Sequence, residues 1–177
     1  MDEFRDGPQP PSAASRAKPA QNAYSRNLPH IQNDGNTLFV TFSTRKRWIL
    51  PEHVRGAVLN HCLHDHGVRI RLHAAVVMPD HVHLIFTPLK DADGETFPLA
   101  TIMSGIKGAA AHSVNRALNR RGPVWELESF DRIMRSSENA YEKGEYICAN
   151  PVRAGLVARE DDWPWLWREW IEGEVAR

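Results

Sequence analysis

Hydrophobic positions recur with two different periods along residues 37–150, and each period predicts one kind of element. Stretches dense in apolar and β-branched residues predict strands at 37–44, 69–78, 81–88 and 124–135. Stretches with apolar residues at helical spacing predict helices at 51–65, 98–121 and 138–150. The order βαββαβα predicts an α/β fold of the α+β kind. We expect a ferredoxin-like sandwich with a mainly antiparallel sheet and its helices on one face.

Prolines and glycines mark the ends of the predicted helices. Pro51 suits the first turn of a helix, and Gly122 with Pro123 ends the second one. Pro151 disfavours the helical conformation at the residue before it, so we expect the third helix to stop at about Asn150.

The composition changes at both ends of the chain and predicts three regions. Residues 1–34 are rich in proline and small polar residues, and we expect a flexible tail there. Residues 35–160 carry the element pattern and are predicted to form the folded domain. Residues 161–177 are acidic and rich in tryptophan. These tryptophans can stack on bases, but we expect them to seal this C-terminal tail onto the core.

Composition excludes some classes of protein. No apolar run is long enough to span a membrane, and the charged first residues show no secretory signal. Two cysteines in such a chain indicate reduced thiols and a cytoplasmic location. The net charge is zero, so binding to nucleic acid would need local basic patches. Basic residues do cluster, in 45–71 and again in 98–121, although solvated faces are the simpler explanation.

The segment MPDHVHLIF, 78–86, places two histidines one residue apart in a predicted strand. Strand side chains alternate between faces, so His81 and His83 lie opposite the more apolar face. Two neutral imidazoles on one face can bind the same metal ion, provided that a third ligand exists. Alternatively, both are ordinary hydrogen-bonded histidines at a sheet surface. We set aside a histidine-triad hydrolase, because Ile85 occupies the third alternating position.

A second distinctive segment, GEYICANPVRAGLV, occupies 144–157. Tyr146 and Asn150 are four residues apart and would share one face of a helix. Taken alone, Tyr146 is better explained as a core or interface aromatic, and Asn150 as a helix cap.

Together these segments resemble the HUH single-tyrosine transposases, and most closely the REP-associated tyrosine transposases. The matching pieces are MPDHVHLIF (78–86), SGIKGAAAHSVNRAL (104–118), VWELESFDRIMR (124–135) and YICANPVRAGLV (146–157). The resemblance implies the same ferredoxin-like fold. It implies that His81 and His83 are metal ligands, that Asn150 is the third ligand and that Tyr146 is the nucleophile. Asp80 departs from the asparagine of many relatives and adds charge near the ion or caps the turn.

The activity that the resemblance implies is cleavage and rejoining of single-stranded DNA at palindromic repeats. A 5′-phosphotyrosine intermediate and Mg²⁺ or Mn²⁺ are expected, as are hairpin DNA as partner and a cytoplasmic, nucleoid-associated location. We expect DNA-phosphate contacts from Lys107, Arg132, Arg135 and Arg153. Alternatively, these are solvated charges, and Arg153 stabilises the turn after the helix that carries Tyr146. The resemblance allows a monomer or a homodimer.

Several alternatives remain open from the sequence. Tyr141 is the nucleophile if the helix register differs. A domesticated protein that binds hairpin DNA without cleaving it is the main competing function, and a metal-binding domain unrelated to DNA is another. HCLHDH, 61–66, superficially suggests zinc, but its spacing suits one helix end, so we predict a structural role.

Overall fold

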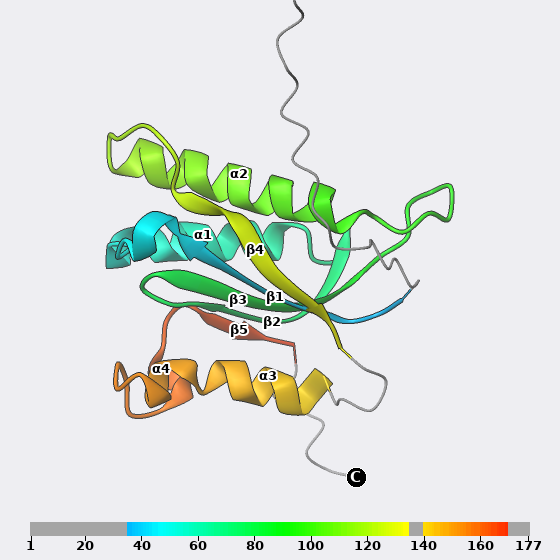
Figure 1. The fold of residues 1–177 in the computed structure, drawn as a ribbon. Coiled ribbons are helices and arrows are strands. Elements are labelled where there is room, and N and C mark those ends of the chain that lie inside the picture. Colours follow the sequence, from blue (N-terminus) through cyan, green and yellow to red (C-terminus); the bar gives the residue numbers. More distant parts are fainter. Residues whose placement is uncertain (1–34, 135–139, 170–177) are drawn as a thin grey trace, which may run out of the picture. The chain divides into compact units, whose positions relative to one another are not determined.

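The computed structural model describes residues 35–134 and 140–169, and in them five strands form one sheet (Figure 1). The strand order is β4-β1-β3-β2-β5, and every paired strand is antiparallel to its neighbour. The strands are β1 Leu38–Thr44, β2 Ile70–Val77, β3 His81–Pro88, β4 Trp125–Ile133 and β5 Leu166–Arg168. The first four lie where the hydrophobic pattern predicts them, and the predicted fold class is confirmed.

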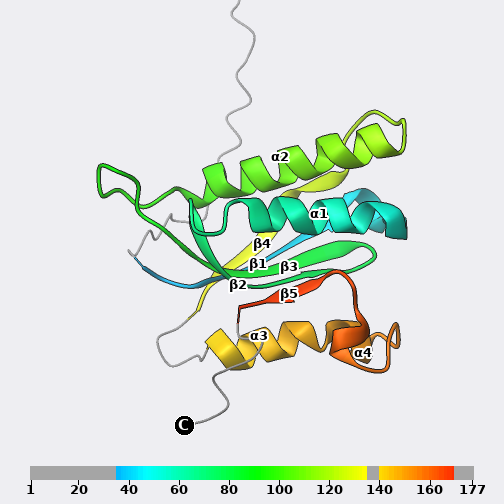
Figure 2. The same cartoon turned by 180° about the vertical axis from the view of Figure 1, so that it is seen from behind.

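The helices lie on both faces of this sheet, not on one face as expected (Figures 1 and 2). The helices are α1 Glu52–His64, α2 Leu99–Ala117, α3 Ala140–Cys148 and α4 Asn150–Arg153, with 3₁₀ turns η1 Arg45–Arg47 and η2 Glu160–Asp162. Helices α1 and α2 cover one face, and α3 with α4 lies beneath the other. No helix in 35–134 or 140–169 is long and apolar enough to cross a membrane.

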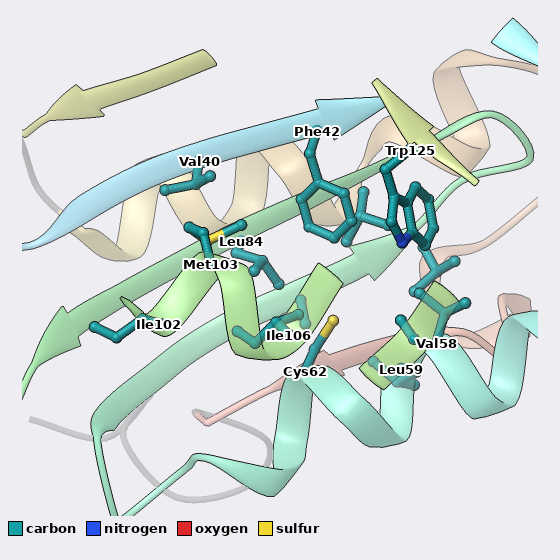
Figure 3. Packing of buried hydrophobic residues seen from close by; sticks show 14 of the residues in the cluster. Val40, Phe42, Val58, Leu59, Cys62, Leu84, Ile102, Met103, Ile106 and Trp125 are labelled. Carbon is teal, nitrogen blue, oxygen red and sulfur yellow. The ribbon is translucent and has the colours of Figure 1, made fainter. Parts of the chain in front are cut away.

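The larger hydrophobic core fills the space between the sheet and helices α1 and α2 (Figure 3). Phe42 of β1 meets the ring of Trp125 edge to face, with ring centroids 4.9 Å apart. Ile106 of α2 and Cys62 of α1 are buried in the same cluster. This packing holds the central strands in register.

The second core explains why α3 takes the opposite face. In β2, the run from Ala74 to Val77 is fully buried at every position, which requires cover on both faces of the sheet. Ala74 and Val76 pack in a second cluster with Ile147 of α3. The expectation that all helices lie on one face was wrong because the continuous apolar run of β2 already indicates a strand that is covered on both faces.

Pro151 does not end the helical path as predicted. Helix α3 ends at Cys148, and the short α4 begins at Asn150 with Pro151 in its first turn. Ala149 between them keeps a helical conformation, with φ −71° and ψ −7°. Proline is tolerated in a first turn because its missing N–H has no partner there in any case. The chain therefore continues helically past Pro151, with the N–H of Arg153 bonded to the Ala149 carbonyl and that of Ala154 to the Asn150 carbonyl, both at 2.9 Å.

The tryptophan-rich segment is part of the fold as far as residue 169. Trp163 is buried in the second core, and its indole donates a hydrogen bond of 3.1 Å to the carbonyl of Val77. Strand β5 pairs with β2 at the sheet edge. The predicted tail 1–34 and the end of the predicted C-terminal tail, 170–177, lie outside the described residues.

Candidate active site

The histidine pair opens strand β3, directly after the turn at Pro79 and Asp80. His83 is opposite Thr41 of β1 and Val76 of β2, and His81 is opposite Ser43. The register places both imidazoles on the face covered by α3. The alternating pattern of β3 therefore predicted the shared face correctly.

The two imidazoles face each other through their Nε2 atoms, which are 3.1 Å apart. Each Nδ1 atom has a different partner: a carboxylate oxygen of Asp80 lies 2.6 Å from that of His81, and the hydroxyl of Thr41 lies 2.7 Å from that of His83. A carboxylate only accepts, so Nδ1 of His81 carries a hydrogen, and in the neutral imidazole Nε2 then has the lone pair. Both rings are thus oriented from behind, as metal-binding histidines usually are.

Asp80 connects this pair to a basic side chain. Its second carboxylate oxygen lies 3.1 Å from Nε of Arg47, and Arg47 also donates a 2.8 Å hydrogen bond to Ser43. The sequence left open whether Asp80 adds charge near a metal ion or caps the turn. In the structure its carboxylate orients His81 and pairs with Arg47.

His83 is neutral over the physiological range. Its pKa is lowered to about 3, chiefly by burial and then by the charges of the nearby His81, Arg153, Lys143 and Arg47, in that order of influence. A neutral imidazole has a free lone pair, which metal binding requires. Lys143 of α3 and Arg153 of α4 are distant from His83 in the sequence, but their charges contribute to lowering its pKa.

Helix α3 brings Tyr146 towards the histidines through a series of ring contacts. The ring of His83 stacks on Phe39, with centroids 5.7 Å apart. The ammonium of Lys143 lies 4.9 Å from the Phe39 ring centroid and 4.5 Å from that of Tyr146. Tyr146 itself is 53% exposed, so its ring is accessible to a large substrate.

Arg153 of α4 folds back against Tyr146 and Asn150. Its guanidinium lies 3.9 Å from the Tyr146 ring centroid and donates a 3.0 Å hydrogen bond to the Tyr146 carbonyl. It also donates to Oδ1 of Asn150. The amide nitrogen of Asn150 is buried and has no hydrogen-bond partner within the described part of the chain.

These contacts decide how well the residues fit the expected metal ion. Two Nε2 atoms 3.1 Å apart can both reach one ion, because ion–nitrogen bonds are about 2.1 Å long. Among the residues that the structure describes, no three His, Cys, Asp or Glu side chains gather as a metal site. The histidine pair fits such an ion, which would need a third ligand of another type. The Asn150 amide is of such a type, with Arg153 now on its oxygen.

The structure describes two of the other predicted DNA contacts, Lys107 and Arg132, and they lie in different environments. Lys107 of α2 donates to the carbonyls of Glu126 and Leu127 and to the Ser129 hydroxyl, at 2.9, 3.1 and 3.1 Å. A phosphate contact would replace one of these bonds. Arg132 is opposite Phe39, so it shares the face of the histidines. Arg135 lies outside the described residues.

Three residues at this site were missed from the sequence. Phe39 and Lys143 link His83 to Tyr146, and Phe130 meets Phe39 edge to face at 6.2 Å while remaining 60% exposed. Lys143 precedes Tyr146 by three residues, which is the spacing of neighbours on a helix. For Phe39 and Phe130, the strand register was needed.

The structural interpretation of HCLHDH is confirmed within the described residues. Cys62 is buried in the larger core, and burial raises the pKa of its thiol to about 12. His61 exchanges a 2.8 Å hydrogen bond with Ser113 of α2. These contacts join α1 to α2.

Comparisons with known proteins agree with the resemblance seen in the sequence. No family model matches the chain. The chain is 24% identical to the REP-associated tyrosine transposase of Escherichia coli over 136 residues, which are 73% of this chain and 74% of that protein. It is 25% identical over 97 residues to a candidate REP-associated tyrosine transposase of Haemophilus influenzae, covering 52% of this chain. The chain spans about half the length of that second relative, 55%.

A solved structure has the same fold. It is a REP-associated tyrosine transposase bound to a REP hairpin, with a TM-score of 0.56 and 24% identity, and the match covers 76% of this chain and 77% of that one. At this identity the likeness concerns the fold. The resemblance to REP-associated tyrosine transposases is thus confirmed in sequence and in fold.

Proposed function

We propose that this protein cleaves and rejoins single-stranded DNA at palindromic repeats, using Tyr146 as its nucleophile and a divalent metal ion. One observation carries the proposal: continuous contacts run from His83 through Phe39 and Lys143 to Tyr146. The similarity to REP-associated tyrosine transposases supports the same assignment, and the solved relative is bound to a REP hairpin.

The proposed reaction exchanges one phosphodiester bond for another. The Tyr146 hydroxyl oxygen attacks phosphorus, and the bond from phosphorus to the 3′ oxygen breaks. That oxygen leaves as a 3′-hydroxyl after taking up a proton, and the phenol releases its own proton to solvent. Attack by a 3′-hydroxyl on the 5′-phosphotyrosine later reverses the exchange and rejoins a strand, with no external energy source.

Two cations flank the nucleophile and suit it to a phosphate substrate. Lys143 and Arg153 lie against the ring of Tyr146, at 4.5 and 3.9 Å. Their charge attracts the phosphate that the phenolic oxygen must reach. Arg132, on the same sheet face, and Phe130, an exposed aromatic beside Phe39, would bind the flanking strand by charge and by stacking.

His81 and His83, with Asn150 as the third ligand, would hold Mg²⁺ or Mn²⁺. When bound, the ion supplies charge that polarises the scissile phosphate. Asp80 and Thr41 keep the two imidazoles in place from their Nδ1 sides. Arg153 would have to release the Asn150 oxygen for this role.

The test uses labelled single strands that carry the palindromic repeats adjoining the gene. Purified protein is incubated with them in Mn²⁺ or Mg²⁺ and analysed on a denaturing gel. We expect a covalent protein–DNA band that requires metal and is lost in Tyr146→Phe. The matched control is Tyr141→Phe, which changes a second exposed tyrosine of the same helix and should keep the band. A band lost only in Tyr141→Phe would contradict the assignment.

Binding of hairpin DNA without cleavage is the second candidate function. The observation that favours it is the hydrogen bond from Arg153 to Asn150, which occupies the expected third metal ligand. Hairpin binding that is equal with and without metal, with no covalent band, would support this alternative.

A further inference from the structure

A second basic site lies at the C-terminal end of α2, the helix that covers the sheet face opposite α3. There a cavity of about 480 Å³ is lined by His112, Asn115, Arg116, Asn119, Arg120 and Arg121. No carboxylate lines it. Guanidinium groups bind phosphate oxygens through parallel hydrogen bonds, so the chemistry of this lining suits a phosphate.

The walls of this cavity are fixed by the loop that ends α2. Asn115 donates a 2.8 Å hydrogen bond to the carbonyl of Gly122. Arg120 stacks on Trp48, 4.4 Å from its ring centroid, and donates to the carbonyl of Pro123 at 3.3 Å. Arg120 is therefore built into the wall.

Arg116 and Arg121 differ from Arg120 because they are exposed and uncompensated. Neither forms an ion pair with any residue in 35–134 or 140–169. Two exposed guanidiniums beside a fixed third one give an anion several donors without requiring an existing bond to break.

Arg120 connects the cavity to the basic turn η1. Trp48, on which Arg120 stacks, directly follows η1, and the amide of Arg45 donates to the carbonyl of Val124, just before β4, at 2.8 Å. Arg45, Lys46 and Arg47 are exposed.

Turn η1 in turn reaches the histidines. Arg47 contacts Asp80, which holds His81, and its charge acts on His83. In Figures 1 and 2 the end of α2, the start of α1, the β2–β3 turn and α4 all lie at the same end of the folded unit. Two carboxylates along this path already have partners, Asp80 with Arg47 and Glu126 with the amide of Lys46.

We propose that this path, from the cavity at the end of α2 across η1 to His81, binds the sugar–phosphate backbone of the DNA substrate. The cavity would hold a phosphate several nucleotides away from the one that reacts. The inference rests on the proposed function for the identity of the nucleic acid. It adds a second contact surface, on the other side of the sheet edge, that explains how a neutral chain binds a polyanion.

The experiment measures the affinity of the full chain for a fluorescent hairpin with single-stranded flanks, over a range of salt concentrations. The variant is Arg116→Gln with Arg121→Gln. The control is Arg71→Gln with Arg159→Gln, which removes the same charge from two exposed arginines that pair with Glu169 and Asp161 elsewhere. We expect the path variant to bind about tenfold or more weakly and to lower the slope of log affinity against log salt by about 1.5. The control should stay within about twofold on the same scale.

Each outcome decides the inference separately from the proposed function. Equal affinity and salt slope in the path variant and wild type would overturn the path, even if wild type forms the covalent band. Loss of affinity in the path variant without any covalent band would support the path and sink the cleavage mechanism. Saturable binding of dTMP that disappears in the variant, with DNA affinity unchanged, would identify a small-anion site and overturn the backbone path. No binding of the hairpin by wild type would overturn both.

Discussion

The two faces of the sheet are made by the same strands but carry different chemistry. On β3, Leu84 and Phe86 are fully buried against α1 and α2, whereas His81 and His83 face α3 and reach only polar or aromatic partners. Strand β1 shows the same division, with Phe42 on the first face and Thr41 on the second. One face is a continuous hydrophobic core, and the other has a smaller core beside the candidate site.

This division shows how the protein can place imidazoles in a central strand. Burying polar groups is unfavourable unless hydrogen bonds compensate. Here the face under α1 and α2 provides the hydrophobic contacts that stabilise β3. The other face can therefore carry polar side chains held in a fixed arrangement. It follows that substitutions on the two faces should have separable effects.

Phe42→Ala should give the largest effect, on stability. The ring is about 1% exposed and packs on Trp125, so its removal leaves a cavity in the larger core. We expect a loss of about 3–5 kcal/mol in the free energy of unfolding. Urea denaturation followed by circular dichroism measures it.

Tyr146→Phe serves as the comparison. Because Tyr146 is more than half exposed, this change should alter the free energy of unfolding by no more than about 0.5 kcal/mol. At a temperature where Phe42→Ala is still folded, the Phe42→Ala variant should form the covalent DNA band, whereas Tyr146→Phe should not. Equal destabilisation by both changes would refute the division between a stabilising face and a functional one.

Asp80 tests the functional face with a smaller effect. Asp80→Ala removes the acceptor for Nδ1 of His81, and residues that orient metal-binding histidines typically contribute about 10–100-fold to metal affinity. We expect the Mn²⁺ concentration for half-maximal cleavage to rise by about that factor, with the rate at saturating Mn²⁺ reduced much less.

Asp80→Asn is the matched control, because its amide oxygen still accepts the hydrogen bond and only the charge is lost. It should require less metal than Asp80→Ala. If both variants were alike, the charge and its pairing with Arg47 would matter and the orientation of His81 would not.

The division between the faces also explains what the sequence could predict. The alternation in HVHLIF was enough to place His81 and His83 together, because strand side chains alternate strictly. Lys143 could have been placed beside Tyr146 from its helical spacing, but Phe39 could not be assigned to the site, since its contacts depend on the pairing of β1 with β3 and on the face that α3 covers. Arg153 was proposed as a DNA contact, but its position on Tyr146, two helical turns earlier, depends on the helical path continuing past Pro151, where the helix was expected to stop.

The last effect concerns pH and the metal-free protein. The pKa of His83 is lowered from its ordinary value to about 3 in the folded state, chiefly by burial. In the unfolded chain His83 therefore binds a proton as the pH falls through about 6.5, whereas in the folded chain it stays neutral until about pH 3. The stability that this difference contributes is fully present above pH 6.5. It is lost as the pH falls towards 3, by up to about 1.4 kcal/mol per pH unit.

Thermal unfolding at pH 7 and pH 5, in EDTA, should show a larger drop in stability for wild type than for His83→Gln, which has no imidazole to titrate at this position. If the two proteins lose the same stability, His83 is solvated and charged in the folded state. The face of the sheet under α3 would then be a wet surface, unlike the dry core across the strands.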